Sequence, residues 1–149
     1  GGSQIWLEAR TRYPLERLLE ATSIRSANDT ADAVARGLAA DGTLETFVRR
    51  MNLRAEGMGL TRMRFTNVHG LPGATADDDN TATPLEVLTL ALTVRQRSEA
   101  RRWLGTRLAP FQHTNGQVIQ MTNTNRLLGE YEGMDGHIAS AAVFARKAR

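Results

Sequence analysis

Apolar residues recur at intervals of three and four residues through the first two thirds of the chain, which predicts a series of helices. The first helix is expected to begin at Pro14 and to end near residues 23–25, and a second begins at Ser26. A third helix starts after Thr43 and ends at Gly57. The apolar positions that lie on one face of each helix are Leu15, Leu18 and Leu19; Ala31, Val34, Ala35 and Leu38; and Leu44, Phe47, Val48, Met51 and Ala55.

A fourth helix has a strong start in the sequence TPLE at residues 83–86. It combines a threonine N-cap, a proline at the first helical position and a glutamate at the third. The helix is expected to run to about Arg101, with its apolar face formed by Leu85, Leu88, Ala91 and Leu92. Before it, residues 63–73 read as a short extended piece and a turn-rich loop, and residues 74–83 as an exposed polar segment.

The period changes after the fourth helix. Residues 111–123 read as two short strands joined at Asn115-Gly116, and residues 137–149 fit either a strand or a short helix. The chain is therefore expected to form one α+β domain. Its helical body would cover about residues 14–104, and its β-rich part about residues 109–149.

Composition narrows the class of protein. The chain has 149 residues, 41% of them hydrophobic, and contains no run long enough to span a bilayer. The lack of cysteine excludes disulfides and thiolate chemistry. The net charge is +3, and the basic residues are all arginine except Lys147. Because acidic residues are interspersed among the arginines, solvated helix faces are a better interpretation than a nucleic-acid interface.

Ser26 and Asn28 form a Ser-x-Asn sequence at the expected start of the second helix. Ser26 followed by Asp29 three residues later has the spacing of a capping box, which by itself accounts for the serine. A bare Ser-x-Asn is also a weak indication of catalysis. From the local sequence alone, the capping interpretation is the stronger of the two.

No metal or cofactor site is expected. His69, His113 and His137 are far apart and lack the spacing of a zinc helix. The acidic run at residues 77–79 lacks the alternating ligands of a calcium loop and is interpreted as a solvated turn. Neither a phosphate-binding glycine loop nor a G-x-S-x-G sequence is present.

The order of several longer segments changes the balance between the capping and catalytic interpretations of Ser26 and Asn28. The segments are GGSQIWLEARTRYPLERLLEATSIRSANDTADAVA (1–35), FVRRMN (47–52), MGLTRMRFTNVHGL (58–71), NTATPLE (80–86), NTNRLLGEYEGMDG (123–136) and IASA (138–141). Together they resemble the serine D-alanyl-D-alanine carboxypeptidases, the low-molecular-mass penicillin-binding proteins. The resemblance covers essentially the whole chain. It implies a β-lactamase/transpeptidase-like fold, represented mostly by its helical part plus a small antiparallel β portion, and makes residues 1–3 native sequence rather than an expression scar.

The resemblance also implies a catalytic role for Ser26 and Asn28. That family uses a Ser-x-x-Lys nucleophile, a Ser-x-Asn on a second wall of the active site and a Lys-Thr-Gly on a strand edge. Ser26 would shuttle a proton toward the leaving amine, and Asn28 would hold the backbone of the acyl donor. In this context the catalytic interpretation outweighs capping, although one serine can serve both purposes.

Two of the three elements are absent from the sequence. No serine is followed three residues later by lysine, and GMDG at 133–136 continues with His137 instead of Lys-Thr-Gly. Lys147 is followed by Ala148-Arg149 and cannot replace that element. We therefore expect an incomplete penicillin-binding domain, either one part of a larger enzyme or a derivative that has lost its nucleophile.

The leading hypothesis is part of a penicillin-sensitive serine carboxypeptidase that trims the terminal D-Ala of peptidoglycan stem peptides. The resemblance implies a periplasmic or otherwise extracytoplasmic location, β-lactam inhibitors, no cofactor, and room for a membrane anchor outside these residues. A class A β-lactamase would share the fold, but HGL (69–71) and NTNRLL (123–128) favour the carboxypeptidase. The alternatives are a catalytically inactive binding module of the same fold and, more weakly, an arginine-rich nucleic-acid binder with steeply salt-dependent binding.

Overall fold

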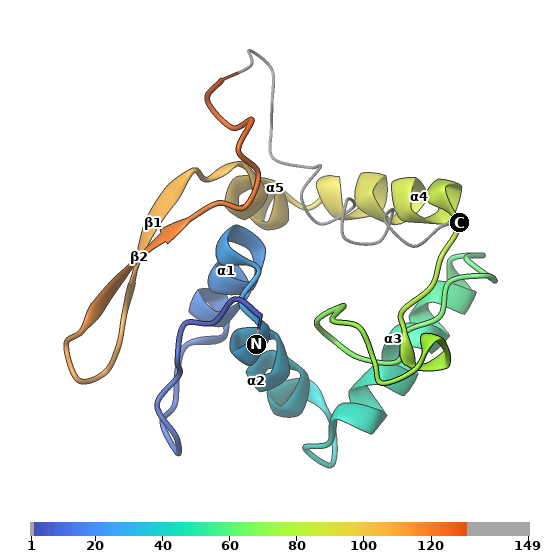
Figure 1. The fold of residues 1–149 in the computed structure, drawn as a ribbon, viewed down its shortest axis with the longest axis horizontal. Helices are drawn as coiled ribbons and strands as arrows, with labels where there is room; N and C mark the ends of the chain where they lie inside the picture. The colour runs from blue at the N-terminus through green and yellow to red at the C-terminus, as the bar shows by residue number, and fades with distance from the viewer. Residues whose placement is uncertain (1, 131–149) are drawn as a thin grey trace.

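The computed structural model describes residues 2–130, in which the helices precede a β-hairpin (Figure 1). The elements are α1 (Leu15–Arg25), α2 (Asn28–Leu38), α3 (Leu44–Gly57), the short 3₁₀ helix η1 (Ala76–Asp78), α4 (Pro84–Arg95), α5 (Ser98–Gly105), β1 (Leu108–Gln112) and β2 (Val118–Thr122). The strands form an antiparallel two-stranded sheet. The expected division into a helical body and a β-rich part to residue 149 stays a prediction, because residues 131–149 lie outside the described part of the chain.

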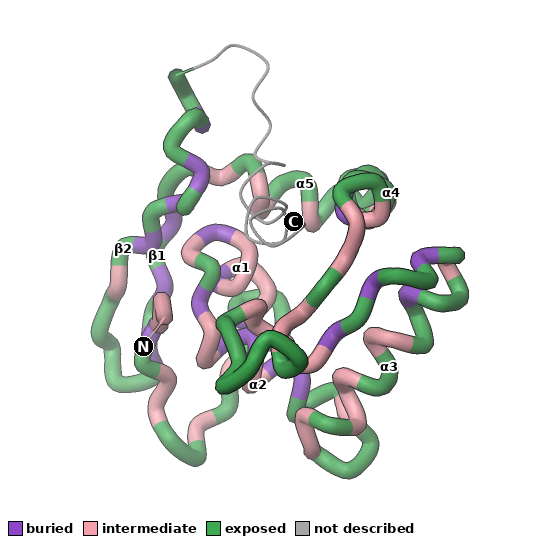
Figure 2. The backbone as a smooth tube through the Cα atoms, turned by 45° about the vertical axis from the view of Figure 1, so that its right-hand side comes forward, coloured by how far each residue is buried: buried purple, intermediate pink, exposed green. Residues whose placement is uncertain are grey.

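One hydrophobic cluster joins α1 to the hairpin. Its fully or almost fully buried members are Ile5, Ala21, Ile24, Ala27, Ala109, Phe111 and Met121. They come from the N-terminal segment, from α1 and the junction after it, and from both strands. Figure 2 shows buried positions on α1 and on the strands beside it. The junction between α1 and α2 is thus packed against the hairpin, which lies far away in sequence.

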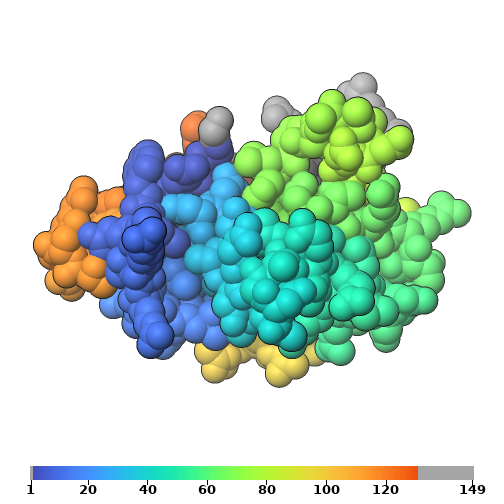
Figure 3. All heavy atoms as spheres, turned by 90° about the horizontal axis from the view of Figure 1, so that it is seen from below, coloured from blue at the N-terminus to red at the C-terminus, as the bar shows by residue number. Residues whose placement is uncertain are grey.

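A second cluster lies at the other end of the helical body. It joins the end of α3, the segment that follows it and α4, through Ala55, Leu60, Met63, Phe65 and Val87. The side chain of Asn52 fixes this segment, because its amide donates to the Phe65 carbonyl and its carbonyl accepts from the Phe65 N–H, each at 2.8 Å. Helices α2 and α3 connect the two clusters and lie side by side in Figure 3.

The predicted start of α4 is confirmed. The Thr83 hydroxyl accepts from the Glu86 N–H at 3.3 Å, and the Glu86 carboxylate accepts from the Thr83 N–H at 2.9 Å. The predicted end near Arg101 is wrong. The helix ends at Arg95, and α5 begins at Ser98 after Arg97 takes an extended conformation. The prediction of a helix here is therefore correct, but its predicted length is not.

The predicted apolar face of α4 is also wrong. Leu85, Leu88 and Leu92 are 71%, 54% and 50% exposed, whereas Val87 is buried in the second cluster with Leu90 packed beside it. The helix is apolar on most sides, so its spacing does not single out one face.

The hairpin prediction is confirmed at its turn and corrected at its first strand. Gly116 has a φ of +87°, which glycine adopts readily, and the His113 N–H donates to the Gln117 carbonyl at 2.7 Å across the loop. Strand β1 begins at Leu108, three residues before the predicted start at Phe111. Pro110 lies inside this strand, which within the described residues pairs on one side only, so the missing N–H of proline is tolerated.

Asp41 gives the loop before α3 a pH dependence that can be measured. Its carboxylate accepts hydrogen bonds from the Thr46 hydroxyl at 2.6 Å and from the Thr43 N–H at 3.0 Å. These bonds, that of Thr46 first, lower the pKa of Asp41 from 3.8 to about 2. Because the folded pKa is lowered, the stabilisation is complete above pH 3.8 and is lost as the pH falls toward 2.

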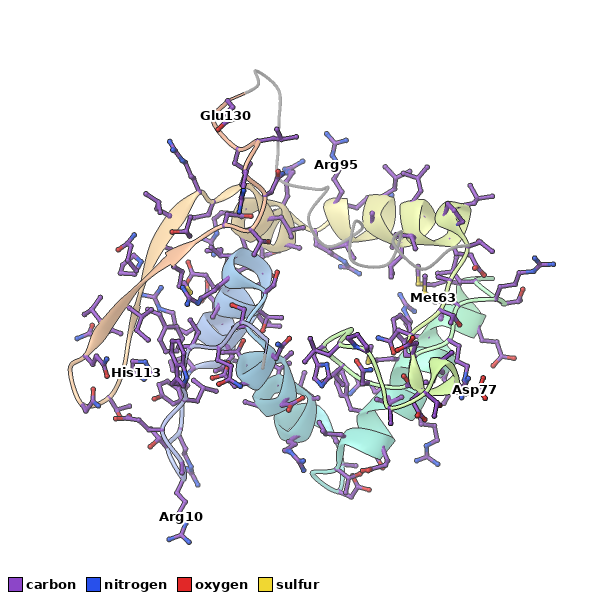
Figure 4. All side chains as sticks on the ribbon, in the orientation of Figure 1. Arg10, Met63, Asp77, Arg95, His113 and Glu130 are labelled. Atoms are coloured by element: carbon purple, nitrogen blue, oxygen red, sulfur yellow. The ribbon has the colours of Figure 1, made fainter. Side chains whose placement is uncertain are left out.

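We expect Asp41→Asn to remove this acid-side loss. The free energy of unfolding, measured with urea between pH 2 and pH 6, should fall less steeply for the variant than for the wild type below pH 4. Asp77→Asn, at an exposed aspartate of η1 (Figure 4), is the control and should keep the wild-type profile. Parallel curves for Asp41→Asn and the wild type below pH 4 would contradict the prediction.

Candidate active site

The junction between α1 and α2 consists of only two residues. Ser26 has φ 53° and ψ 41°, the left-handed conformation, and forms the C-cap of α1. Ala27 is extended and precedes α2 with no side-chain cap. The predicted capping box of Ser26 and Asp29 is therefore wrong. Two consecutive helices need a sharp change of direction, and the left-handed residue at the end of the first provides it.

Asp29 instead holds the N-terminal segment against the junction. Its carboxylate accepts from the Ile5 N–H at 3.1 and 3.2 Å and from the Leu7 N–H at 3.0 Å. The Asn28 N–H donates to the Ser3 carbonyl at 2.8 Å. Residues 3–7 therefore run alongside the start of α2 as a third part of the site.

Ser26 is exposed and lies beside the turn that follows the hairpin. Its Oγ is 3.3 Å from the Oγ1 of Thr124, and the Thr124 N–H donates to the Ile24 carbonyl at 3.1 Å. Thr124 belongs to the segment NTNRLL, but sequence reasoning did not single it out. The two residues are 98 positions apart in the sequence, so local spacing cannot predict their contact.

The side chain of Asn28 lies against Gly2. A Cβ added at Gly2 would be 1.9 Å from Asn28 Nδ2 and 3.3 Å from Cδ2 of Leu71. Glycine at this position therefore leaves the space that the carboxamide occupies. Within residues 2–130 the carboxamide makes no hydrogen bond, so its donors and acceptor are available on this side of the junction.

The two histidines in the described residues, His69 and His113, make no hydrogen bond with Ser26 or Asn28. The Nδ1 of His69 accepts from the Leu71 N–H at 3.2 Å. His113 is buried and its Nδ1 is 3.0 Å from the Tyr13 hydroxyl. The described part of the chain contains no group of three or more histidine or acidic side chains that could hold a metal ion. His137 and Lys147 lie outside that part.

Around His113, a hydrogen-bonded group fastens the hairpin loop to the N-terminal segment (Figure 4). The Tyr13 hydroxyl donates to Glu8 at 3.1 Å, and the Thr114 hydroxyl donates to the same carboxylate. The Thr114 bond is the main cause of the lowered pKa of Glu8, and burial raises the pKa of Tyr13. The group has a structural role, since it holds one end of the segment that Asp29 holds at the other.

Two of the hollows in the described structure are lined by other residues. One of about 730 Å³ lies between α3 and residues 60–69, and an apolar groove of about 350 Å³ is lined by residues of α3 and α4. Neither is lined by Ser26 or Asn28. The candidate active site is therefore defined by the exposed Ser26, the half-buried Asn28 and the residues that contact them.

Comparison with known proteins decides the family. The family model described as D-alanyl-D-alanine carboxypeptidase matches residues 1–142. The chain belongs to the D-alanyl-D-alanine carboxypeptidase family. The D-alanyl-D-alanine carboxypeptidase DacF of Bacillus subtilis (strain 168) is 29% identical over 136 residues, which are 91% of this chain and 33% of DacF. The family predicted from the segment order is thereby confirmed.

Solved structures show the same fold. A variant of the Streptomyces K15 DD-transpeptidase matches with a TM-score of 0.79 and 23% identity, covering 91% of this chain and 54% of its own. The carboxypeptidase DacD of Francisella tularensis matches at 0.78 and 20%, covering 91% and 43%. A Mycobacterium tuberculosis D-alanyl-D-alanine carboxypeptidase matches at 0.74 and 23%, covering 91% and 53%. The expected transpeptidase-like fold, helical with a small antiparallel sheet, is confirmed.

The carboxypeptidase family match does not favour the inactive-module or nucleic-acid hypotheses. The chain spans one third of DacF and about half of the matching structures. The roles of Ser26 and Asn28 remain predictions.

Proposed function

We propose that this chain is part of a serine D-Ala-D-Ala carboxypeptidase, a hydrolase that removes the terminal D-Ala of peptidoglycan stem peptides. The family match over residues 1–142 carries the proposal. The junction at Ser26 and Asn28 supports it, because the Ser26 side chain is exposed and the Asn28 carboxamide makes no hydrogen bond within residues 2–130.

In this proposal Ser26 and Asn28 bind and protonate the substrate around the scissile amide. A serine nucleophile attacks the carbonyl carbon between the two D-Ala residues, the C–N bond breaks, and water later hydrolyses the resulting ester. The attacking serine loses a proton, and the Ser26 hydroxyl accepts it while passing its own proton to the nitrogen of the departing D-Ala. The carboxamide of Asn28 donates to the peptide carbonyl of the donor and accepts from its N–H.

In this proposal the nucleophile lies outside residues 1–149. Residues 1–149 contain no serine followed three residues later by lysine and no Lys-Thr-Gly. The short coverage of DacF and of the matching structures supports the view that these residues are one portion of the enzyme. An enzyme lacking a nucleophile retains little activity, because the groups of such a site act together.

The proposed substrate determines the location and the inhibitors. Peptidoglycan lies outside the cytoplasm, so the enzyme is proposed to act in the periplasm or elsewhere in the cell envelope. A β-lactam would acylate the same nucleophile. Within residues 2–130, no helix combines the length and hydropathy needed to cross a bilayer.

The intact mass of the purified protein, with and without prior incubation with benzylpenicillin, tests the proposal. We expect a mass above the 16.4 kDa of residues 1–149 and a gain of one drug molecule. Heat-denatured protein is the control and should gain nothing. A mass of 16.4 kDa with no adduct would overturn the proposal and favour the hypothesis of an inactive binding module.

A further inference from the structure

The turn beside Ser26 is fixed by a buried asparagine. Asn123 is 6% exposed, and its side-chain amide donates to the carbonyls of Leu104 and Thr106 at 3.0 and 2.9 Å. Its side-chain carbonyl accepts from the Asn125 N–H at 2.9 Å, and its own N–H donates to the Arg107 carbonyl at 2.9 Å. All the hydrogen-bonding groups of this side chain are occupied in holding the turn to the end of α5.

A second buried asparagine holds the other side of the turn. Asn125 is 8% exposed, and its side-chain carbonyl accepts from the Leu127 N–H at 3.1 Å. Thr124 lies between the two asparagines and is exposed. In the sequence N-T-N, the two asparagines are thus buried and fix the backbone of the turn. The threonine between them is exposed to solvent. This arrangement gives Thr124 a fixed place without help from its own side chain.

Thr124 is attached to the α1 end of the junction at two points. Its N–H donates to the carbonyl of Ile24, and its hydroxyl lies 3.3 Å from that of Ser26. Ser26 is a left-handed residue, a conformation that is unfavourable for a residue with a Cβ. Its backbone is therefore restricted, and the remaining freedom of its Oγ is rotation about χ1. The Thr124 hydroxyl limits that rotation.

We propose that Thr124 is a positioning residue that holds the Ser26 hydroxyl in the orientation needed for proton transfer. The Thr124 hydroxyl donates to Ser26 Oγ and leaves the Ser26 proton directed toward the substrate. The Ser26 oxygen can accept this bond while it gives up its own proton. This inference rests on the proposed function of Ser26.

The test compares three variants of the full-length protein with a fluorescent penicillin. Thr124→Val keeps the shape and removes the hydroxyl, and we expect it to slow acylation about ten-fold, the effect of losing one hydrogen bond. Thr124→Ser restores the hydroxyl and should return the rate to within about three-fold of the wild type. Thr122→Val, at an exposed threonine of β2, is the matched control and should react at the wild-type rate.

The outcomes separate this inference from the proposed function. If the wild type is not acylated, the proposed function fails and the inference fails with it. If the wild type is acylated and Thr124→Val reacts equally fast, only the inference fails. If Thr124→Val and Thr124→Ser are equally slow and both melt at a lower temperature, the threonine serves the fold and the inference is overturned.

Discussion

We expect Ser26→Ala in the full-length protein to lower the rate of β-lactam acylation about 10²- to 10⁴-fold, the range for loss of a positioned acid–base group. The substitution removes Oγ and keeps Cβ, so the left-handed backbone of residue 26 carries the same cost as before. Ser26 is exposed, and its Oγ contacts only Thr124 among the described residues. The loss should therefore appear in the reaction rate and not in the melting temperature.

Ser26→Gly tests whether Ser26 is needed for the reaction and not for stability. Glycine is the preferred residue at a left-handed C-cap, because it has no Cβ to clash with the backbone. We expect this variant to be at least as stable as the wild type and as slow as Ser26→Ala. A serine that is less favourable than glycine for the fold, yet necessary for the reaction, would be one kept for its chemistry.

Ser98→Ala supplies the matched control for both variants. Ser98 is an exposed serine at the start of α5, and its hydroxyl donates to Glu99 at 3.0 Å. Its loss should leave acylation unchanged. Acylation rates measured with a fluorescent penicillin, together with thermal melts, decide the outcome. Wild-type acylation by Ser26→Ala would remove Ser26 from the mechanism and with it the proposed proton shuttle.

The elements that the sequence predicts well are those with local causes. The start of α3 depends on Thr43, whose hydroxyl accepts from the N–H of Thr46, and that of α4 on Thr83 and Glu86. The turn at Gly116 is equally local. In each case the residues that interact are within a few positions of each other, so a short pattern contains the whole interaction.

The predictions that were wrong depended on partners far away. Asp29 has the spacing to cap with Ser26, but the Ile5 and Leu7 N–H groups, 24 and 22 positions earlier, take its carboxylate instead. These groups belong to an extended segment whose course no periodicity reveals. Hydrophobic spacing likewise could not choose the buried face of α4, because tertiary packing decides among several apolar sides.

The candidate site shows the same division. Ser26 and Asn28 were predicted from the order of the family segments, since their local spacing alone is better explained by a helix start. Gly2 and Thr124 contact Asn28 and Ser26 in the structure, but nothing in their local sequence indicates this. Their positions follow from the packing of the N-terminal segment and of the turn after β2 on either side of the junction.

Asp29→Ala should cost the protein about 3 kcal/mol of unfolding free energy, because it leaves the N–H groups of Ile5 and Leu7 without their acceptor. Urea denaturation measures the loss. Hydrogen exchange locates it, since the amides of Ile5 and Leu7 should lose protection while that of Ala109 in the hairpin keeps it. Asp29→Asn retains one acceptor oxygen, so its free energy of unfolding should lie between those of the wild type and Asp29→Ala.

Asp32→Ala is the control on the same helix. Its Oδ1 is buried without a hydrogen-bond partner among the described residues, so its removal should not destabilise the protein. Unchanged stability of Asp29→Ala, with Ile5 and Leu7 still protected, would show that other contacts suffice to hold the N-terminal segment.

The effect of Asp29→Ala should extend to the reaction. The segment it releases includes Ser3, whose carbonyl accepts from the Asn28 N–H, and Gly2, against which the Asn28 carboxamide lies. Once the segment moves, Asn28 loses the surface that orients it. We therefore expect slower acylation even at temperatures where the variant is fully folded. A segment that served stability alone would leave the folded variant as reactive as the wild type, so the rate in the folded state separates a structural clamp from a wall of the active site.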